Sequence, residues 1–268
     1  MATDEKIRLA AVGDLHCRTG RHGHFRKLVD DANSAEVDAL VLCGDLTDHG
    51  LPDEAKALLD ELSRVRAPIV GVLGNHDLES GKGEEVCSIL REGGIHILDG
   101  DHWEPKGRAV GFAGTKGFAG GFDRASLQGF GEEVIKAFVY ETVREALKLE
   151  SALLRVDAPV KVVITHYAPV RATCVGENPE ILPFLGSSRL ADSIDLYGAA
   201  VILHGHAHYG SEEGQTLTGI PVYNVASPVL RKADPERRMR LIELDRVSEQ
   251  PQPGSTAGGG EAGAHPAG

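Results

Sequence analysis

The chain has 268 residues, of which 41% are hydrophobic, and a formal net charge of -12 at pH 7. This length and composition are those of an ordinary globular protein that can bury one large α/β core. The negative charge opposes binding to a nucleic-acid backbone or an anionic membrane surface, and no stretch approaches the roughly 18 apolar residues that a membrane span needs.

The cysteines and the first residues indicate the compartment. The four cysteines form no CxxC pair, so reduced thiols are the simplest interpretation. Residues 1–6 contain no apolar segment of the kind found in signal peptides. We therefore expect a cytoplasmic protein.

The first part of the chain alternates predicted strands and helices. Short apolar runs bounded by turn signals fit strands of a sheet covered on both faces. Between them, apolar residues three and four apart predict amphipathic helices, and Pro52 suits the first turn of the second helix. This βαβαβ order with right-handed crossovers predicts a parallel sheet. The predicted strands are 9–12, 41–43 and 69–73, and the predicted helices are 25–32 and 52–65.

The remainder of the chain predicts further strands and helices. The last three predicted strands are antiparallel and complete a second sheet. Beyond about residue 246 the chain has no apolar pattern, so we expect one domain over 1–246 and a disordered tail over 247–268. The predicted strands are 95–98, 108–114, 160–165, 199–203, 216–218, 221–225 and 239–243, and the predicted helices are 84–91, 132–155 and 189–197, the last capped by Gly186-Ser187-Ser188.

Two segments are predicted to be loops. Residues 115–122 are rich in glycine but lack the spacing of a P-loop, so we interpret them as a rim loop near the site. Residues 167–188 contain three prolines and show no convincing period. A loop of that length is usually functional or disordered.

Five of the predicted strands end in residue types that bind metals. Gly44 lets the backbone turn, so Asp45 projects from the carboxyl end of its strand, where open α/β sheets bind ligands. Side chains two apart on an extended segment point the same way, so Asp14 and His16 can bind one ion together, and so can His206 and His208. The five motifs are Asp14-Leu15-His16, Gly44-Asp45, Gly74-Asn75-His76-Asp77, His166 and Gly205-His206-Ala207-His208.

The residue types indicate a dinuclear centre. The two oxygens of Asp45 can bridge two cations. Mixed nitrogen and oxygen ligands without a required thiolate suit Mn, Fe, Zn or Co. Two ions about 3.5–4 Å apart would clamp the attacking and leaving oxygens of an in-line displacement at phosphorus. The predicted chemistry is hydrolysis of a phosphate ester.

The ordered set of motifs, together with Gly44-Asp45-x-x-Asp48, resembles the calcineurin-like metallophosphoesterases from residue 7 to about 245. The resemblance implies a four-layer α/β/β/α sandwich of two mixed sheets flanked by helices. It also implies that His76 acts on the phosphate or the leaving group without binding metal. The implied ligands are Asp14, His16, Asp45 and His208 for one ion, and Asp45, Asn75, His166 and His206 for the other.

Two departures bear on the substrate. Asp48 is followed by His49-Gly50, where the protein serine/threonine phosphatases carry Arg-Gly. Leu78-Glu79 follow Asp77, where class III cyclic-nucleotide phosphodiesterases usually carry an arginine. The chain looks more like the small prokaryotic phosphoesterases related to that cyclic-nucleotide group.

Several residues keep two interpretations. Asp48 and Asp77 either orient the ligands or His76, or simply cap local backbone. His204 is interpreted as a hydrogen-bonded core histidine in preference to a ligand. Arg171 and Arg189 are candidates for binding the substrate phosphate, although a structural role is the more common one.

The leading functional hypothesis is hydrolysis of a phosphodiester, small or nucleotide-like, by a metal-activated hydroxide. The alternatives are a phosphomonoesterase acting on a nucleotide or phosphoprotein, and a non-catalytic scaffold of the same fold. A nuclease is opposed by the acidic charge. The substrate, the metal pair and the oligomeric state stay open.

Overall fold

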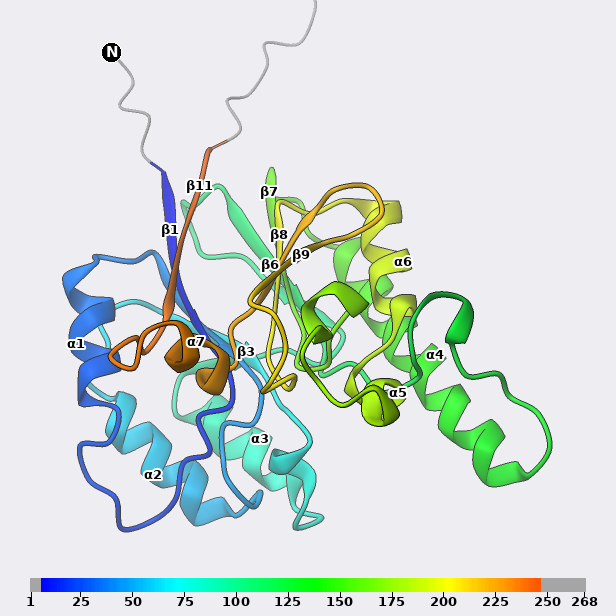
Figure 1. The fold of residues 1–268 in the computed structure, drawn as a ribbon. Helices are drawn as coiled ribbons and strands as arrows, with labels where there is room; N and C mark the ends of the chain where they lie inside the picture. Colours follow the sequence, from blue (N-terminus) through cyan, green and yellow to red (C-terminus); the bar gives the residue numbers. More distant parts are fainter. Residues whose placement is uncertain (1–5, 247–268) are drawn as a thin grey trace, which may run out of the picture.

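A computed structural model describes residues 6–246. Two β-sheets stack face to face with helices on both outer sides, which gives four α/β/β/α layers (Figure 1). In the five-stranded sheet the order is β11-β1-β2-β3-β4, and in the six-stranded sheet it is β5-β6-β7-β8-β10-β9. The predicted tail over 247–268 lies outside the described residues.

The strands occupy these positions: β1 Ile7–Val12, β2 Ala39–Cys43, β3 Ile69–Val72, β4 Ile95–Ile97, β5 Asp101–Trp103, β6 Val110–Gly114, β7 Val160–Ile164, β8 Val201–His204, β9 Glu213–Gln215, β10 Pro221–Asn224 and β11 Arg240–Leu244. The helices are α1 Arg26–Ser34, α2 Pro52–Leu62, α3 Gly83–Glu92, α4 Glu133–Leu153, α5 Leu182–Leu185, α6 Ser188–Tyr197 and α7 Ser227–Ala233. Short 3₁₀ helices are η1 His76–Leu78, η2 Asp123–Ala125, η3 Arg171–Cys174 and η4 Pro179–Ile181.

The parallel core of each sheet follows from its apolar runs. All five residues of β2 are buried, as expected for a strand covered on both faces. β1 to β4 pair in parallel, as do β6, β7, β8 and β10, while β5, β9 and β11 are antiparallel edge strands. Because the parallel strands run in one direction, their carboxyl ends carry the predicted ligands to one side of the molecule.

Two strand predictions are wrong. Residues 216–218 form a turn after β9, because the hydroxyls of Thr216 and Thr218 both bond to Asp195 on α6. The strand predicted at 239–243 exists as β11, but it pairs with β1 in the first sheet and not with the second. Local pattern indicates an extended segment, whereas the partner of an edge strand depends on packing of the whole chain.

The prediction of a loop over residues 167–188 is also partly wrong. The segment contains η3, η4 and α5. The helix cap predicted at its end is confirmed, since the hydroxyl of Ser187 accepts the backbone N–H of Arg189 at 3.3 Å. Strand β5 and helix α7 were not predicted.

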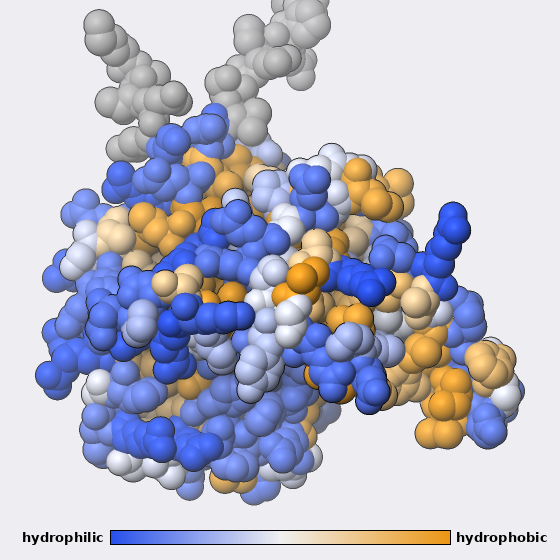
Figure 2. All heavy atoms as spheres, in the orientation of Figure 1, coloured by the Kyte–Doolittle hydropathy of each residue, from blue (hydrophilic) through white to orange (hydrophobic). Residues whose placement is uncertain are grey.

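Helix α4 extends beyond the second sheet at its N-terminal end (Figure 1). Apolar side chains gather on this end (Figure 2), where Phe130 is 71% and Val134 72% exposed. In residues 6–246, no helix combines the length and hydropathy required to cross a bilayer.

Candidate metal centre

The predicted ligands come together where the two sheets meet. Asp14 and Asp45 follow β1 and β2 of the first sheet, whereas His166 and His206 follow β7 and β8 of the second. The backbone N–H of His206 donates to both carboxylate oxygens of Asp14, at 3.2 and 3.1 Å. This contact joins segments that lie 192 residues apart.

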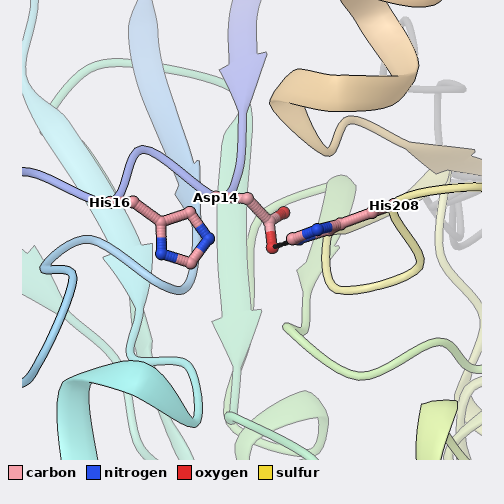
Figure 3. Close-up of side chains that lie close together, drawn as sticks. All are labelled: Asp14, His16 and His208. Atoms are coloured by element: carbon pink, nitrogen blue, oxygen red, sulfur yellow. Dashed lines mark hydrogen bonds and ion pairs between the residues drawn. The ribbon is translucent and has the colours of Figure 1, made fainter.

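One cluster consists of Asp14, His16 and His208. Their side chains face one another in Figure 3, and one potential ligand atom from each lies within 4.8 Å of the others. Nε2 of His208 lies 2.8 Å from Oδ1 of Asp14. Burial would raise the pKa of Asp14, but the hydrogen bond from His208 and the nearby imidazoles outweigh it and lower the pKa to about 2. Asp14 is therefore a carboxylate at neutral pH.

A second cluster consists of Asp45, His166 and His206. Oδ1 of Asp45 lies 3.4 Å from Nε2 of His166, and Oδ1 of Asn75 lies 3.0 Å from the same nitrogen. The other carboxylate oxygen, Oδ2 of Asp45, is 4.0 Å from Nε2 of His16 in the first cluster. Asp45 thus presents one oxygen to each cluster.

The backbone at these ligands is not extended. The inference that side chains two apart point the same way assumed extended segments. Asp14, His16, Asp45 and His206 all have positive φ, between 47° and 68°. The strands end before them, at Val12, Cys43 and His204, so tight turns and not strand alternation aim the side chains. His206 consequently joins the Asp45 cluster and His208 the Asp14 cluster. Left-handed non-glycine residues cost on the order of 1–3 kcal/mol each and gather at functional sites.

Two glycines permit the close packing around Asp45. Gly44 has a φ of +81°, and a Cβ there would overlap the imidazole of His166. A Cβ on Gly74 would overlap Oδ1 of Asp45. A larger residue at either position would displace a predicted ligand.

Asp77 holds the ends of β2 and β3 together. Its side chain is fully buried and accepts hydrogen bonds from the backbone N–H groups of Leu46, Thr47 and Gly74, and from the hydroxyl of Thr47. These bonds cap the backbone of two segments, and those segments carry the predicted ligands Asp45 and Asn75.

Asp48 contacts three side chains near the first cluster, those of His16, Arg18 and His76. Its Oδ1 lies 3.5 Å from Nδ1 of His16, its Oδ2 lies 2.6 Å from Nε of Arg18, and its backbone carbonyl lies 2.7 Å from Nδ1 of His76. Sequence reasoning missed Arg18, because an arginine in a polar loop carries no spacing signal. The ion pair with Asp48 offsets the charge of Arg18.

His76 lies at the edge of the first cluster, with its ring centroid 4.5 Å from that of His16. Since a carbonyl only accepts, Nδ1 of His76 donates to Asp48, and Nε2 remains for a second partner. Burial lowers the pKa of His76, but the bond to Asp48 and the carboxylates of Asp45 and Glu79 outweigh it and raise the pKa above its usual value.

The remaining candidates lie elsewhere. His204 is fully buried with its ring nitrogens 2.8 Å from the hydroxyl of Thr173 and from the carbonyl of Gly205, as expected for a core histidine. Arg171 and Arg189 line a separate cavity alongside α6, and none of the predicted metal ligands belongs to its lining.

The donors fit transition-metal ions. Asp14 and Asp45 are only 2% and 1% exposed, and buried carboxylates are stabilised by hydrogen bonds, by a charged partner or by a metal ion. Burial lowers the pKa of His206 to about 3, so its ring is neutral at pH 7 and offers a lone pair. Nε2 of His16 faces Oδ2 of Asp45, while its Nδ1 faces Asp48 and makes no hydrogen bond within residues 6–246.

Comparisons with known sequences agree with this geometry. The chain is 26% identical to a protein of Rhodococcus erythropolis described as a probable cyclic nucleotide phosphodiesterase, across 82% of this chain and 67% of the relative. It is also 26% identical to the DNA double-strand break repair protein Mre11 of Methanopyrus kandleri, across 90% of this chain but only 54% of that protein.

Solved structures share the fold. The phosphopantetheinyl hydrolase of Mycobacterium tuberculosis superposes with a TM-score of 0.61 at 19% identity, covering 94% of this chain and all of that one (100%). The protein TT1561 of Thermus thermophilus superposes with a TM-score of 0.53 at 16% identity, covering 91% of this chain and 100% of that one. Residues 7–210 match the calcineurin-like phosphoesterase family, with every ligand motif inside that range, and the chain belongs to this family.

Proposed function

We propose that this protein hydrolyses a phosphodiester, small or nucleotide-like, at a centre of two transition-metal ions. The observation that carries the proposal is the position of Asp45, with one oxygen toward each cluster of donors. Mn, Fe and Zn suit this mixture of imidazole and carboxylate donors. One ion would be held by Asp14, His16, Asp45 and His208, and the other by Asp45, Asn75, His166 and His206.

The bound ions would supply Lewis-acid activation of the attacking water and would neutralise charge on the phosphate. The protein positions the donors through Asp77 and the turns that follow the strands. His76 holds the proton for the leaving oxygen. The bond from its Nδ1 to the carbonyl of Asp48 fixes the ring and leaves Nε2 to carry that proton, which an imidazole can give up near neutral pH.

The limited positive charge near the two clusters favours a diester over a monoester as the substrate. A monoester is a dianion and requires more positive charge than a monoanionic diester. Arg18 is paired with Asp48, Arg171 and Arg189 line the separate cavity, and Lys116 lines the cavity between α3 and α4, whose lining contains none of the predicted metal ligands. The similarity to a relative described as a cyclic nucleotide phosphodiesterase supports the same preference.

The test combines metal analysis with two matched substrates. Protein as isolated and after addition of Mn²⁺ is analysed for ions per chain, and kcat/KM is measured for bis-p-nitrophenyl phosphate and p-nitrophenyl phosphate. We expect two ions and a higher kcat/KM for the diester. A clearly higher kcat/KM for the monoester would show that the protein is a phosphomonoesterase instead. Failure to bind ions or to hydrolyse either ester would favour a scaffold.

We also propose a reducing, cytoplasmic location. All four cysteines are free. Burial raises the pKa of Cys17 and of Cys174 to about 12, which keeps both thiols protonated and unreactive.

A further inference from the structure

A cavity of about 690 Å³ lies between α3 and α4, and none of the predicted metal ligands belongs to its lining. Leu73 and Leu78 line it, and each is two residues from Asn75 or His76. Lys116 also lines it, and the carbonyl of Lys116 accepts the backbone N–H of His166 at 3.0 Å. The cavity thus adjoins the segments that carry ligands from both sheets.

Most cations in the cavity wall are neutralised by carboxylates. Arg144 lies 2.7 Å from Glu141, and Lys148 lies 2.8 Å from both Asp99 and Glu145. The longest of these ion pairs joins Arg91 and Asp101, at 3.6 Å. These pairs are close to neutral, and the carboxylates of Glu84 and Glu92 also line the cavity.

Lys116 is different. Within residues 6–246 its Nζ has no carboxylate at ion-pair distance, and its one hydrogen bond goes to the carbonyl of Gly117 at 2.7 Å. Since an ammonium has three donors, two are left without an acceptor. Nζ also lies 5.0 and 5.1 Å from the ring centroids of Phe118 and Tyr167.

The carboxylate that acts on Lys116 most strongly is committed to other groups. Oε2 of Glu145 accepts the hydroxyl of Thr115 and the N–H of Gly117, while Oε1 pairs with Lys148. Burial lowers the pKa of Lys116, and Glu145 offsets this only in part. A desolvated cation with spare donors, lining a cavity, has the chemistry of an anion-binding group.

The geometry points to a subsite for one ester arm of the substrate, in which Lys116 binds a second anionic group carried by that arm. Leu73, Leu78 and Leu98 provide an apolar surface for the body of the arm. Tyr167 connects the subsite to the metal centre, because its ring lies 4.4 Å from that of His206 and also faces Lys116. This inference rests on the proposed function, since the metal centre would hold the reacting phosphate.

The test compares two substrates that differ only in a second phosphate. These are the p-nitrophenyl ester of thymidine 5′-phosphate and the same ester carrying a 3′-phosphate. Both release p-nitrophenol, so the leaving group is constant. With Mn²⁺ present, the wild type should show a kcat/KM roughly 10- to 100-fold higher for the bisphosphate, the range for a hydrogen bond to a charged group.

Two variants locate the effect. Lys116→Met keeps an unbranched side chain of similar length and removes the charge, so the ratio of the two kcat/KM values should fall to near one. Arg144→Met removes a cation of the same wall that is already paired with Glu141, so the ratio should be retained. An equal ratio in wild type and Lys116→Met would overturn the assignment.

A binding measurement separates this inference from the proposed function. Calorimetry on Mn²⁺-loaded wild type compares thymidine 3′,5′-bisphosphate with thymidine 5′-monophosphate. If both esters are hydrolysed at the same rate and both nucleotides bind with the same affinity, the subsite is refuted. The proposed phosphodiesterase activity would still be supported. Tighter binding of the bisphosphate without hydrolysis would refute the diesterase and support the subsite.

Discussion

The substitution Asp77→Asn tests whether the ligand loops depend on one buried carboxylate. Asp77 is fully buried and its two oxygens each accept two hydrogen bonds. Oδ1 accepts the N–H and the hydroxyl of Thr47, at 2.8 and 2.6 Å. Oδ2 accepts the N–H groups of Leu46 and Gly74, at 3.1 and 2.8 Å.

Asparagine keeps one acceptor oxygen and turns the other into an NH₂ donor. That NH₂ group must face either two backbone N–H groups or the pair from Thr47, so one or two buried donors lose their acceptor. Each costs about 1–3 kcal/mol. Burial raises the pKa of Asp77, although bonds from Thr47 and Gly74 oppose this, so removing the charge recovers part of the loss. We expect a net destabilisation of about 2–4 kcal/mol.

The assay is urea unfolding of chelator-treated protein at pH 7, which removes metal from the comparison. The control is Asp157→Asn, because Asp157 is exposed and its side chain makes no hydrogen bond or ion pair within residues 6–246. The control should change stability by less than about 0.5 kcal/mol. In the folded variant, metal affinity should fall roughly 10- to 100-fold, the usual effect of losing a group that orients ligands.

Two results would refute this reasoning. A loss below about 1 kcal/mol would mean that the buried donors find other acceptors. If the variant is clearly destabilised but its metal affinity is unchanged, the hydrogen bonds of Asp77 do not determine the positions of Asp45 and Asn75.

Three further predictions use other parts of the molecule. Asp45→Asn should lose more metal than any other single-ligand change and abolish turnover; two ions per chain at the wild-type rate would disprove the bridge. His76→Ala should keep both ions, measured by metal analysis, and slow turnover roughly 10²- to 10⁴-fold, most for alkyl leaving groups; loss of one ion would make His76 a ligand. Burial alone would raise the pKa of Glu212, but bonds from Arg237 and Arg240 lower it below its ordinary value of 4.5. The contribution of Glu212 to stability is therefore present above pH 4.5 and is lost as the pH falls through the lowered pKa. Glu212→Gln should therefore cost about 1–3 kcal/mol in urea unfolding at pH 7 and less at pH 4; an undiminished difference at pH 4 would contradict the ionic origin.

Local sequence was sufficient for most elements. The apolar run of β2 and the stripes of α2 and α4 predict their positions within a few residues, because burial on both faces or on one helical face leaves a period in the sequence. The residue types at the strand ends likewise predict a metal centre, since imidazoles and carboxylates are uncommon directly after buried strands.

Contacts between distant segments were decided only by the tertiary structure. The pairing of β11 with β1, the ion pair of Arg18 with Asp48, and the lone ammonium of Lys116 beside Tyr167 have no local signal. The split of His206 and His208 between two clusters was implied by the family resemblance, but its physical cause is a set of left-handed turns that alternation does not describe. Side-chain chemistry and period are properties of short segments, whereas partners and orientations depend on how the two sheets pack.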